Sequence, residues 1–145
     1  MTRSDTTRIL DWARDRLATT GFRLATERQL GSSGDRLVEF RHASLIVEIS
    51  LDRGQVFLTM RTAAGVGDHD LGLWEACLDG REPSTDARDL SADLDFLAAR
   101  LADLERLAAE GGDALADCLR TAGRRRFSAR RDLGLTSRGP GVSEV

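Results

Sequence analysis

The chain contains no lysine, asparagine or tyrosine, and only two cysteines, two histidines and two prolines among its 145 residues. All 21 basic residues are therefore arginine, which indicates a GC-rich coding sequence and makes arginine abundance alone a weak sign of nucleic-acid binding. No apolar run approaches the ~18 residues of a membrane span, and the first residues lack the apolar stretch of a signal peptide. These absences predict a soluble cytoplasmic protein that does not associate with membranes.

The scarcity of histidine and cysteine weighs against catalysis. Asp68-His69-Asp70 is similar to the paired His and Asp of metal phosphohydrolases, but those enzymes need further histidines, and the only other one here is His42. The competing interpretation is a helix start, where Asp68 or Asp70 caps free amides. Cys77 and Cys118 form no CxxC motif, and both are expected to be reduced thiols that fill apolar helical faces. We therefore predict no enzyme activity, no metal and no cofactor.

Charge is distributed unevenly along the chain. Residues 1–65 carry 10 arginines and 8 acids, residues 66–113 carry 4 and 13, and residues 114–145 carry 7 and 3. An acidic middle segment with a net charge of −9 thus separates two mildly basic ends. Whether the acidic segment and the basic C-terminal segment meet in the fold is left open by the sequence.

The N-terminal part begins with a helix and then changes to alternating periodicity. Ser4 or Asp5 is expected to cap the helix, and Gly21 to end it. Four runs at 22–30, 36–42, 44–51 and 55–62 then predict strands joined by short turns, which is typical of an antiparallel meander. The residues expected on the buried faces of the helix and of the third and fourth strands are Ile9, Leu10, Trp12, Ala13, Leu17, Leu45, Val47, Ile49, Leu51, Val56, Leu58 and Met60.

The rest of the chain is predicted to be helical. Residues 68–80 place Leu71, Trp74 and Leu78 on one face, with Gly80 as a stop. A leucine stripe over 90–108 predicts the next helix, with Ser91 as its cap and 111–112 as its end. The stripe is expected to pack on the sheet rather than to form a coiled coil. A last helix begins at 113. The predicted fold is a single α+β domain over 1–133, with three C-terminal helices covering one sheet face and a disordered tail at 134–145.

The arginine run at 122–134 is the most conspicuous local feature. Its arginines would cover most of a helix circumference, without the aromatic or polar base readers of a groove-binding face. We interpret it as a helix terminus, where cations suit the exposed carbonyls, and place Phe127 on the packed face. The alternative interpretation is a nucleic-acid contact made by Arg124, Arg125, Arg126, Arg130 and Arg131.

The segment LVEFRHASLIVEISLDRGQVFLTM (37–60), with the helix before it and the short Trp-containing helix after it, resembles small cytosolic α+β immunity and unknown-function proteins of bacterial polymorphic toxin systems. The resemblance implies a non-catalytic inhibitor that binds one cognate toxin. Independently, an acidic patch attracts cationic protein surfaces and speeds encounter. The predicted partner-binding residues are Asp68, Asp70, Glu75, Asp79, Glu82, Asp86 and Asp89.

A second candidate class is a small acidic secretion or assembly chaperone. Chaperones of the type III systems are also small, acidic and α+β, but they place a helix between strands, whereas this chain does not. In either class the partner is a protein, and the chain itself is expected to be a monomer or a homodimer.

Overall fold

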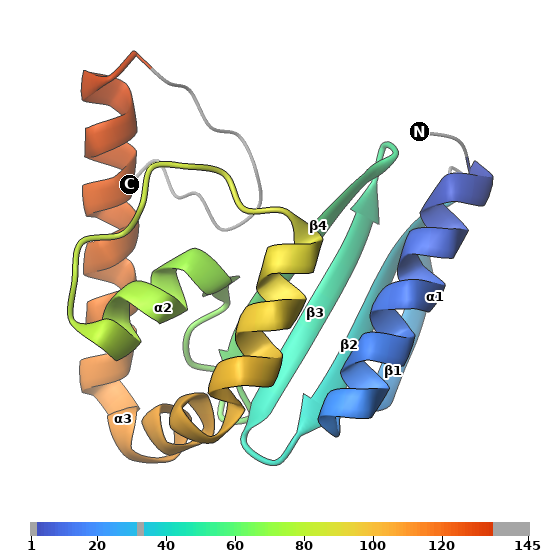
Figure 1. The fold of residues 1–145 in the computed structure, drawn as a ribbon, viewed down its shortest axis with the longest axis horizontal. Helices are drawn as coiled ribbons and strands as arrows, with labels where there is room; N and C mark the ends of the chain where they lie inside the picture. The colour runs from blue at the N-terminus through green and yellow to red at the C-terminus, as the bar shows by residue number, and fades with distance from the viewer. Residues whose placement is uncertain (1–2, 32–33, 135–145) are drawn as a thin grey trace.

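The computed structural model describes residues 3–31 and 34–134 (Figure 1). Its elements are α1 (Arg3–Thr20), β1 (Arg23–Leu30), β2 (Asp35–His42), β3 (Leu45–Asp52), β4 (Gln55–Thr62), β5 (His69–Asp70), α2 (Leu71–Asp79) and α3 (Leu90–Asp132). The α+β class and the antiparallel arrangement of the sheet are thus confirmed. The tail predicted at 134–145 lies, from residue 135 onward, outside the described residues.

The sheet has five strands in the order β1-β2-β3-β4-β5, every neighbouring pair antiparallel. Its fifth strand was not predicted. His69 and Asp70 pair with Met60 and Thr59 of β4, and two residues are too few for an alternating pattern to appear in the sequence. The predicted alternation of β3 is confirmed, because Leu45, Val47, Ile49 and Leu51 are all buried.

In helix α1, the spacing of apolar residues predicted the buried face only in part. Leu10, Ala13 and Leu17 are buried as predicted, but Trp12 is 40% exposed and carries the Arg16 guanidinium against its ring. The buried stripe follows a three-then-four spacing that starts at Leu10, so Trp12 lies outside it. The predicted cap was also wrong, since the helix already includes Arg3 and therefore places Asp5 in its first turn.

The C-terminal helices begin and end at side-chain and backbone caps. Asp70 caps α2 by accepting a hydrogen bond from Leu73 N at 3.2 Å, and Gly80 ends that helix, both as predicted. The cap of α3 is Asp89, which accepts from Ala92 N at 2.8 Å, rather than the predicted Ser91. Two residues inside α3 depart from helical backbone angles, Arg100 (φ −120°, ψ 16°) and Gly112 (φ 48°, ψ −134°), and Gly112 separates 113–132 from the preceding part where a helix end was predicted.

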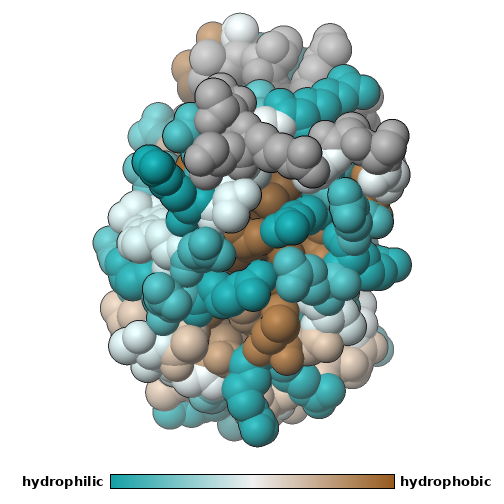
Figure 2. All heavy atoms as spheres, turned by 90° about the vertical axis from the view of Figure 1, so that its right-hand side faces the viewer, coloured by the Kyte–Doolittle hydropathy of each residue, from teal (hydrophilic) through white to brown (hydrophobic). Residues whose placement is uncertain are grey.

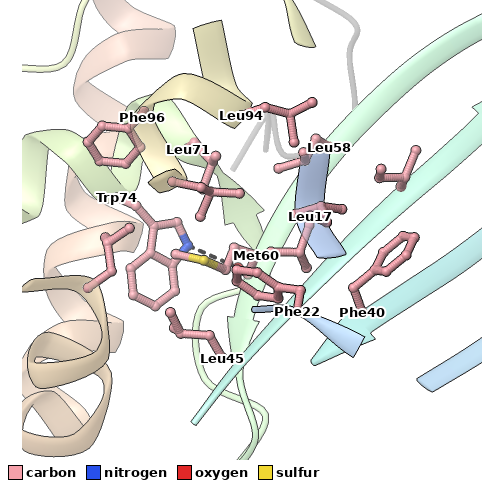
Figure 3. Packing of buried hydrophobic residues seen from close by; sticks show 14 of the residues in the cluster. Leu17, Phe22, Phe40, Leu45, Leu58, Met60, Leu71, Trp74, Leu94 and Phe96 are labelled. Carbon is pink, nitrogen blue, oxygen red and sulfur yellow. Dashed lines mark hydrogen bonds between the residues drawn. The ribbon is translucent and has the colours of Figure 1, made fainter. Parts of the chain in front are cut away.

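One hydrophobic core joins the sheet to the helices (Figure 3). Leu94, Leu97 and Leu104 of the predicted leucine stripe are buried against it, so α3 packs on the sheet, as expected. Trp74 of α2 lies at the centre and donates its indole N–H to the carbonyl of Met60 at 2.9 Å. In the described part of the chain, no helix combines the length and apolar content that a bilayer span requires.

The side formed by α1 and β1 is mainly hydrophilic, with apolar side chains visible between charged ones (Figure 2). Every residue of β1 is exposed, because this strand pairs only with β2 and forms one edge of the sheet. Leu24 and Leu30 are its large apolar residues. The charged side chains that flank them are of the kind that discourage unwanted pairing of an open edge.

Candidate functional site

The acidic middle segment and the arginine run meet in the folded chain. Arg126 of α3 donates from Nη1 to Asp70 Oδ1 at 2.9 Å and from Nη2 to Asp70 Oδ2. Arg126 is only 6% exposed, so its guanidinium is buried where α3 packs on the neighbouring elements. Bidentate pairs of this kind are the strong, geometrically specific form of an arginine–carboxylate contact.

Two other members of the run also contact the acidic segment. Arg125 pairs with Glu82 at 2.8 Å on the surface, and Arg130 donates from Nε to the carbonyl of Thr85 at 3.1 Å. Arg124 and Arg131 are exposed. The run therefore provides structural contacts at the end of α3. Phe127 is only half-buried, and the fully packed position is Arg126 instead.

A signal for the burial of Arg126 was present in the sequence. Leu115, Leu119 and Ala122 are buried at spacings of four and three, and position 126 is the next on that stripe. An arginine at this position is compatible with the fold because Asp70 offers a carboxylate within the packed region. The identity of that carboxylate could not be read from the spacing.

The seven acids of the predicted partner-binding surface do not form one free patch. Asp70 and Asp89 cap helices, while Glu75, Asp79 and Glu82 form ion pairs with arginines. Asp68 and Asp86 are exposed. The arginine partners of Glu75 and Asp79 are Arg81, Arg88 and Arg100. Much of the negative charge that the sequence concentrates here is thus compensated within the chain.

A cleft of about 190 Å³ lies where α2, the 80–89 loop and both ends of α3 converge on β4. Asp93 on its wall is 7% exposed, and burial raises the pKa of its carboxyl group to about 7 against the lowering effect of Arg88. Arg88 Nε lies 3.0 Å from Asp93 Oδ1, an ion pair without an aligned hydrogen bond. The described lining includes no histidine or cysteine, so the cleft offers a titratable carboxyl but neither of those nucleophiles.

The Asp68-His69-Asp70 motif is divided among three structural roles. Asp68 is exposed, Asp70 caps α2 and binds Arg126, and His69 opposes the buried Met60 in the sheet. Burial lowers the pKa of His69, and its Nδ1 is buried without a hydrogen-bond partner. His42 lies three strands away, about 14 Å at the usual strand spacing, and pairs with Glu105 at 2.8 Å. Among the described residues, no group of three or more His, Cys, Asp or Glu side chains is placed to hold a metal ion.

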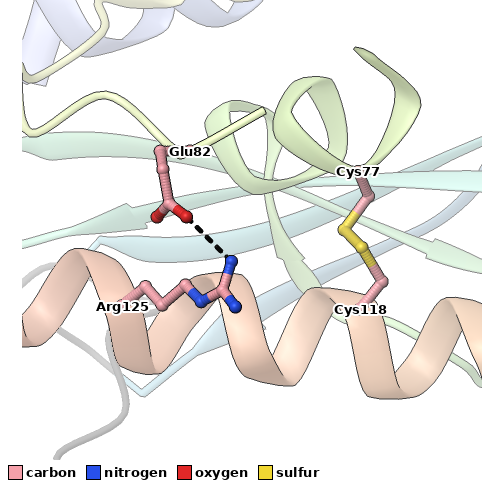
Figure 4. The surroundings of a disulfide bond; sticks show 4 residues. All are labelled: Cys77, Glu82, Cys118 and Arg125. Carbon is pink, nitrogen blue, oxygen red and sulfur yellow. Dashed lines mark hydrogen bonds and ion pairs between the residues drawn. A yellow bond between two sulfur atoms is a disulfide. The ribbon is translucent and has the colours of Figure 1, made fainter. Parts of the chain in front are cut away.

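The cysteines contradict their prediction as separate thiols. Cys77 of α2 and Cys118 of α3 form a disulfide, with their Cα atoms 6.0 Å apart (Figure 4). Cys77 is half-buried and Cys118 is exposed, so neither simply fills the core. The 41-residue separation gave no hint of the bond, because it depends on α2 packing alongside the second half of α3.

The sheet face opposite the core holds a second cluster of charge. Glu39 and Glu48 lie directly opposite each other on β2 and β3, and Arg61 of β4 binds both carboxylates, at 3.0 and 3.1 Å. Burial and then the nearby negative charge of Asp68 raise the pKa of Glu48, against the lowering effect of Arg61. We call Glu39, Glu48 and Asp68 the acidic face. Arg61 contacts two of these three carboxylates, and Arg28 also lowers the pKa of Glu48.

Comparisons of this chain with protein-family models, with curated proteins and with solved structures find no match.

Proposed function

We propose that this protein is a non-catalytic protein-binding module of the immunity type, which captures a cationic partner through the acidic face. The observation that carries the proposal is the cross-strand pair Glu39–Glu48, which shares Arg61, with Asp68 close enough to raise the pKa of Glu48 against the lowering effects of Arg61 and Arg28. The acids of the 70–82 region are less suitable for this role, because arginines of the same chain already bind them. Of the seven acids first predicted, Asp68 is the one that belongs to the proposed surface.

The cross-strand pairs of this sheet face support a binding role. Like charges directly opposite each other in a sheet are destabilising, yet Glu39 faces Glu48, and Arg23 faces Arg41 in the neighbouring row. Burial is the main cause of the raised pKa of Glu48, and the negative charges of Asp68 and Glu39 raise it further, against the lowering effects of Arg61 and Arg28. A lysine or arginine of a partner would offset these negative charges and lower that pKa.

Such a surface acts mainly on the rate of encounter. Complementary charge accelerates diffusional association, and the effect weakens as salt screens it. A partner with a basic active-site surface, such as a nuclease toxin domain, has the required charge. Specificity would then come from shape and from the half-exposed Leu37 and Ile46 beside the acidic face.

The test begins with affinity purification from the native host and identification of co-purifying proteins. Association with the purified partner is then measured by stopped flow for wild type and for the double variant Glu48→Gln/Asp68→Asn. We expect association to slow by roughly 3- to 10-fold at low salt, and its salt dependence to weaken.

The matched control is Asp11→Asn/Glu110→Gln, which makes the same change in net charge at exposed positions on α1 and α3. If the control variant slowed association as much as the acidic-face variant, the effect would come from net charge and not from this surface. An unchanged rate in the acidic-face variant would place the interface elsewhere.

A further inference from the structure

We propose that the Cys77–Cys118 disulfide is a redox-sensitive latch, which a dithiol reductant opens to release the C-terminal half of α3 from α2. This half, residues 113–132, is here called the C-terminal arm. The proposal goes beyond partner binding, since it concerns a site of thiol–disulfide exchange on a different part of the molecule. It rests on three features of the fold: a broken helix, a localised set of contacts and an accessible disulfide.

The break in α3 makes the arm a separate unit. Gly112 has φ 48° and ψ −134°, a backbone conformation that is not helical and that L side chains rarely adopt. Residues 90–111 pack on the sheet, whereas the arm lies along α2 (Figure 1). Movement about Gly112 can therefore displace the arm without disturbing the leucine stripe.

The contacts that hold the arm are concentrated on α2 and the segment around it. Leu115, Leu119 and Ala122 are buried in the core, and Asp70 binds Arg126 at the end of the same stripe. The disulfide is the one covalent connection between the arm and α2. Reduction would leave a short apolar stripe and the ion pairs to hold it.

The disulfide is open to attack. Cys118 is exposed, and both cysteines line a groove of about 550 Å³ between α2, residues 80–83 and the arm. Arg81 and Arg125 line the same groove, and Figure 4 shows Arg125 with its partner Glu82 on the same stretch of the arm as Cys118. The groove leaves room for an attacking thiolate beside the two cysteines.

The exchange balances as a two-electron step. A thiolate of the dithiol attacks Cys118 Sγ, forms a mixed disulfide and expels Cys77 as a thiolate. The second thiol of the reagent then attacks its own sulfur in the mixed disulfide, so that Cys118 leaves as a thiolate. The dithiol is oxidised to a cyclic disulfide, and its two protons pass to the cysteine thiolates or to solvent.

Release of the arm has a specific consequence for the arginine run. Arg125 and Arg126 would lose Glu82 and Asp70, so their backbone would become accessible to an arginine-specific protease. The face of α2 that contacts the arm would lose protection at the same time. Residues of β2 and β3 should be unaffected, because the main contacts of α3 are with α2, α1 and β4.

The experiment compares the oxidised full chain with the same protein after treatment with dithiothreitol, by hydrogen exchange and by brief trypsin digestion with mass mapping. We expect amide exchange to rise ~100-fold in 71–82 and 113–132, and new cleavage after Arg124, Arg125 and Arg126. The variant Cys77→Ser/Cys118→Ser should behave like the reduced protein, with or without dithiothreitol.

Three outcomes would overturn the latch. Unchanged protection of the arm after reduction would show that the apolar stripe and ion pairs suffice. An equal rise of amide exchange throughout β2 and β3 would show that the disulfide stabilises the whole domain and not the arm alone. Two titratable thiols in protein equilibrated with oxidised glutathione would show that the bond does not form.

Discussion

Asp70 and Arg126 lie 56 positions apart in the chain and share two hydrogen bonds in the fold, Nη1 to Oδ1 at 2.9 Å and Nη2 to Oδ2. Asp70 Oδ1 also accepts from Leu73 N and so caps α2. The carboxylate of Asp70 thus caps the start of α2 and binds Arg126 of α3, while the backbone of the same residue pairs with Thr59 at the sheet edge. This is the point at which the acidic segment and the arginine run become one structural unit.

Loss of the Arg126 side chain should therefore be costly. Arg126→Gln leaves Asp70 partly buried without its cation, and we expect the free energy of unfolding to fall by ~2–4 kcal/mol. Arg125→Gln removes an exposed pair with Glu82 and should cost less than ~1 kcal/mol. Urea unfolding of both variants at pH 7, with the disulfide intact, measures the difference. Equal costs would show that burial of the pair contributes nothing.

Stability should depend on the titration of Asp93. Burial raises the pKa of its carboxyl from 3.8 to about 7 in the folded protein, so between these values the folded state binds more protons than the unfolded state. Its contribution therefore makes the free energy of unfolding fall as pH rises from about 4 to 8, on the order of 2–4 kcal/mol. Burial lowers the pKa of His69, which acts in the opposite direction as pH falls through 6.5.

The difference between wild type and Asp93→Asn isolates this effect from that of His69. We expect the variant to be the more stable protein at pH 8 and to lose its advantage near pH 4, in a series of urea unfolding curves. Glu110→Gln, at an exposed position of the same helix, is the control and should run parallel to wild type. A parallel curve for Asp93→Asn would mean that Asp93 is ionised throughout this range.

Substitution of two glycines in one loop would distinguish the cost of backbone strain from the cost of close packing. Gly65 and Gly67 have similar positive φ angles of 89° and 81°, but only a Cβ at Gly67 would meet another side chain, at 2.5 Å from Leu119 Cδ1. Gly65→Ala should cost ~1–2 kcal/mol from strain alone. Gly67→Ala should cost a further ~1–3 kcal/mol, because Leu119 and the arm must shift. Thermal unfolding of both variants tests this, and similar melting temperatures would contradict it.

The arginine run should not bind nucleic acid strongly. Arg125, Arg126 and Arg130 already have partners in the fold, and the chain carries a net charge of −3. Neutralising six phosphates would make affinity fall by ~10³ or more between 50 and 200 mM salt. We expect only weak, salt-sensitive association in fluorescence-anisotropy titrations with short DNA and RNA. Sub-micromolar binding at ~150 mM salt, abolished by changing Arg124, Arg125 and Arg130 together to Gln, would make the run a functional site.

The sequence alone was sufficient for features that depend on local periodicity. The alternation in β3 places its four apolar residues in the core, and the leucine stripe of α3 packs on the sheet, as their spacings predicted. Gly21 and Gly80 end their helices for the same reason, since helix stops depend on local backbone conformation. Such features involve residues within a few positions of one another.

Tertiary structure alone decided which charges remain free and which cysteines meet. Asp70 and Glu82 appeared as surface acids in the sequence, yet arginines 56 and 43 positions away bind them. Cys77 and Cys118 appeared to be independent thiols until α2 packed against the arm. Composition and periodicity specify which face of an element is apolar, but not which distant element covers it. Ion pairs, disulfides and the burial of Arg126 depend on which distant element covers each face.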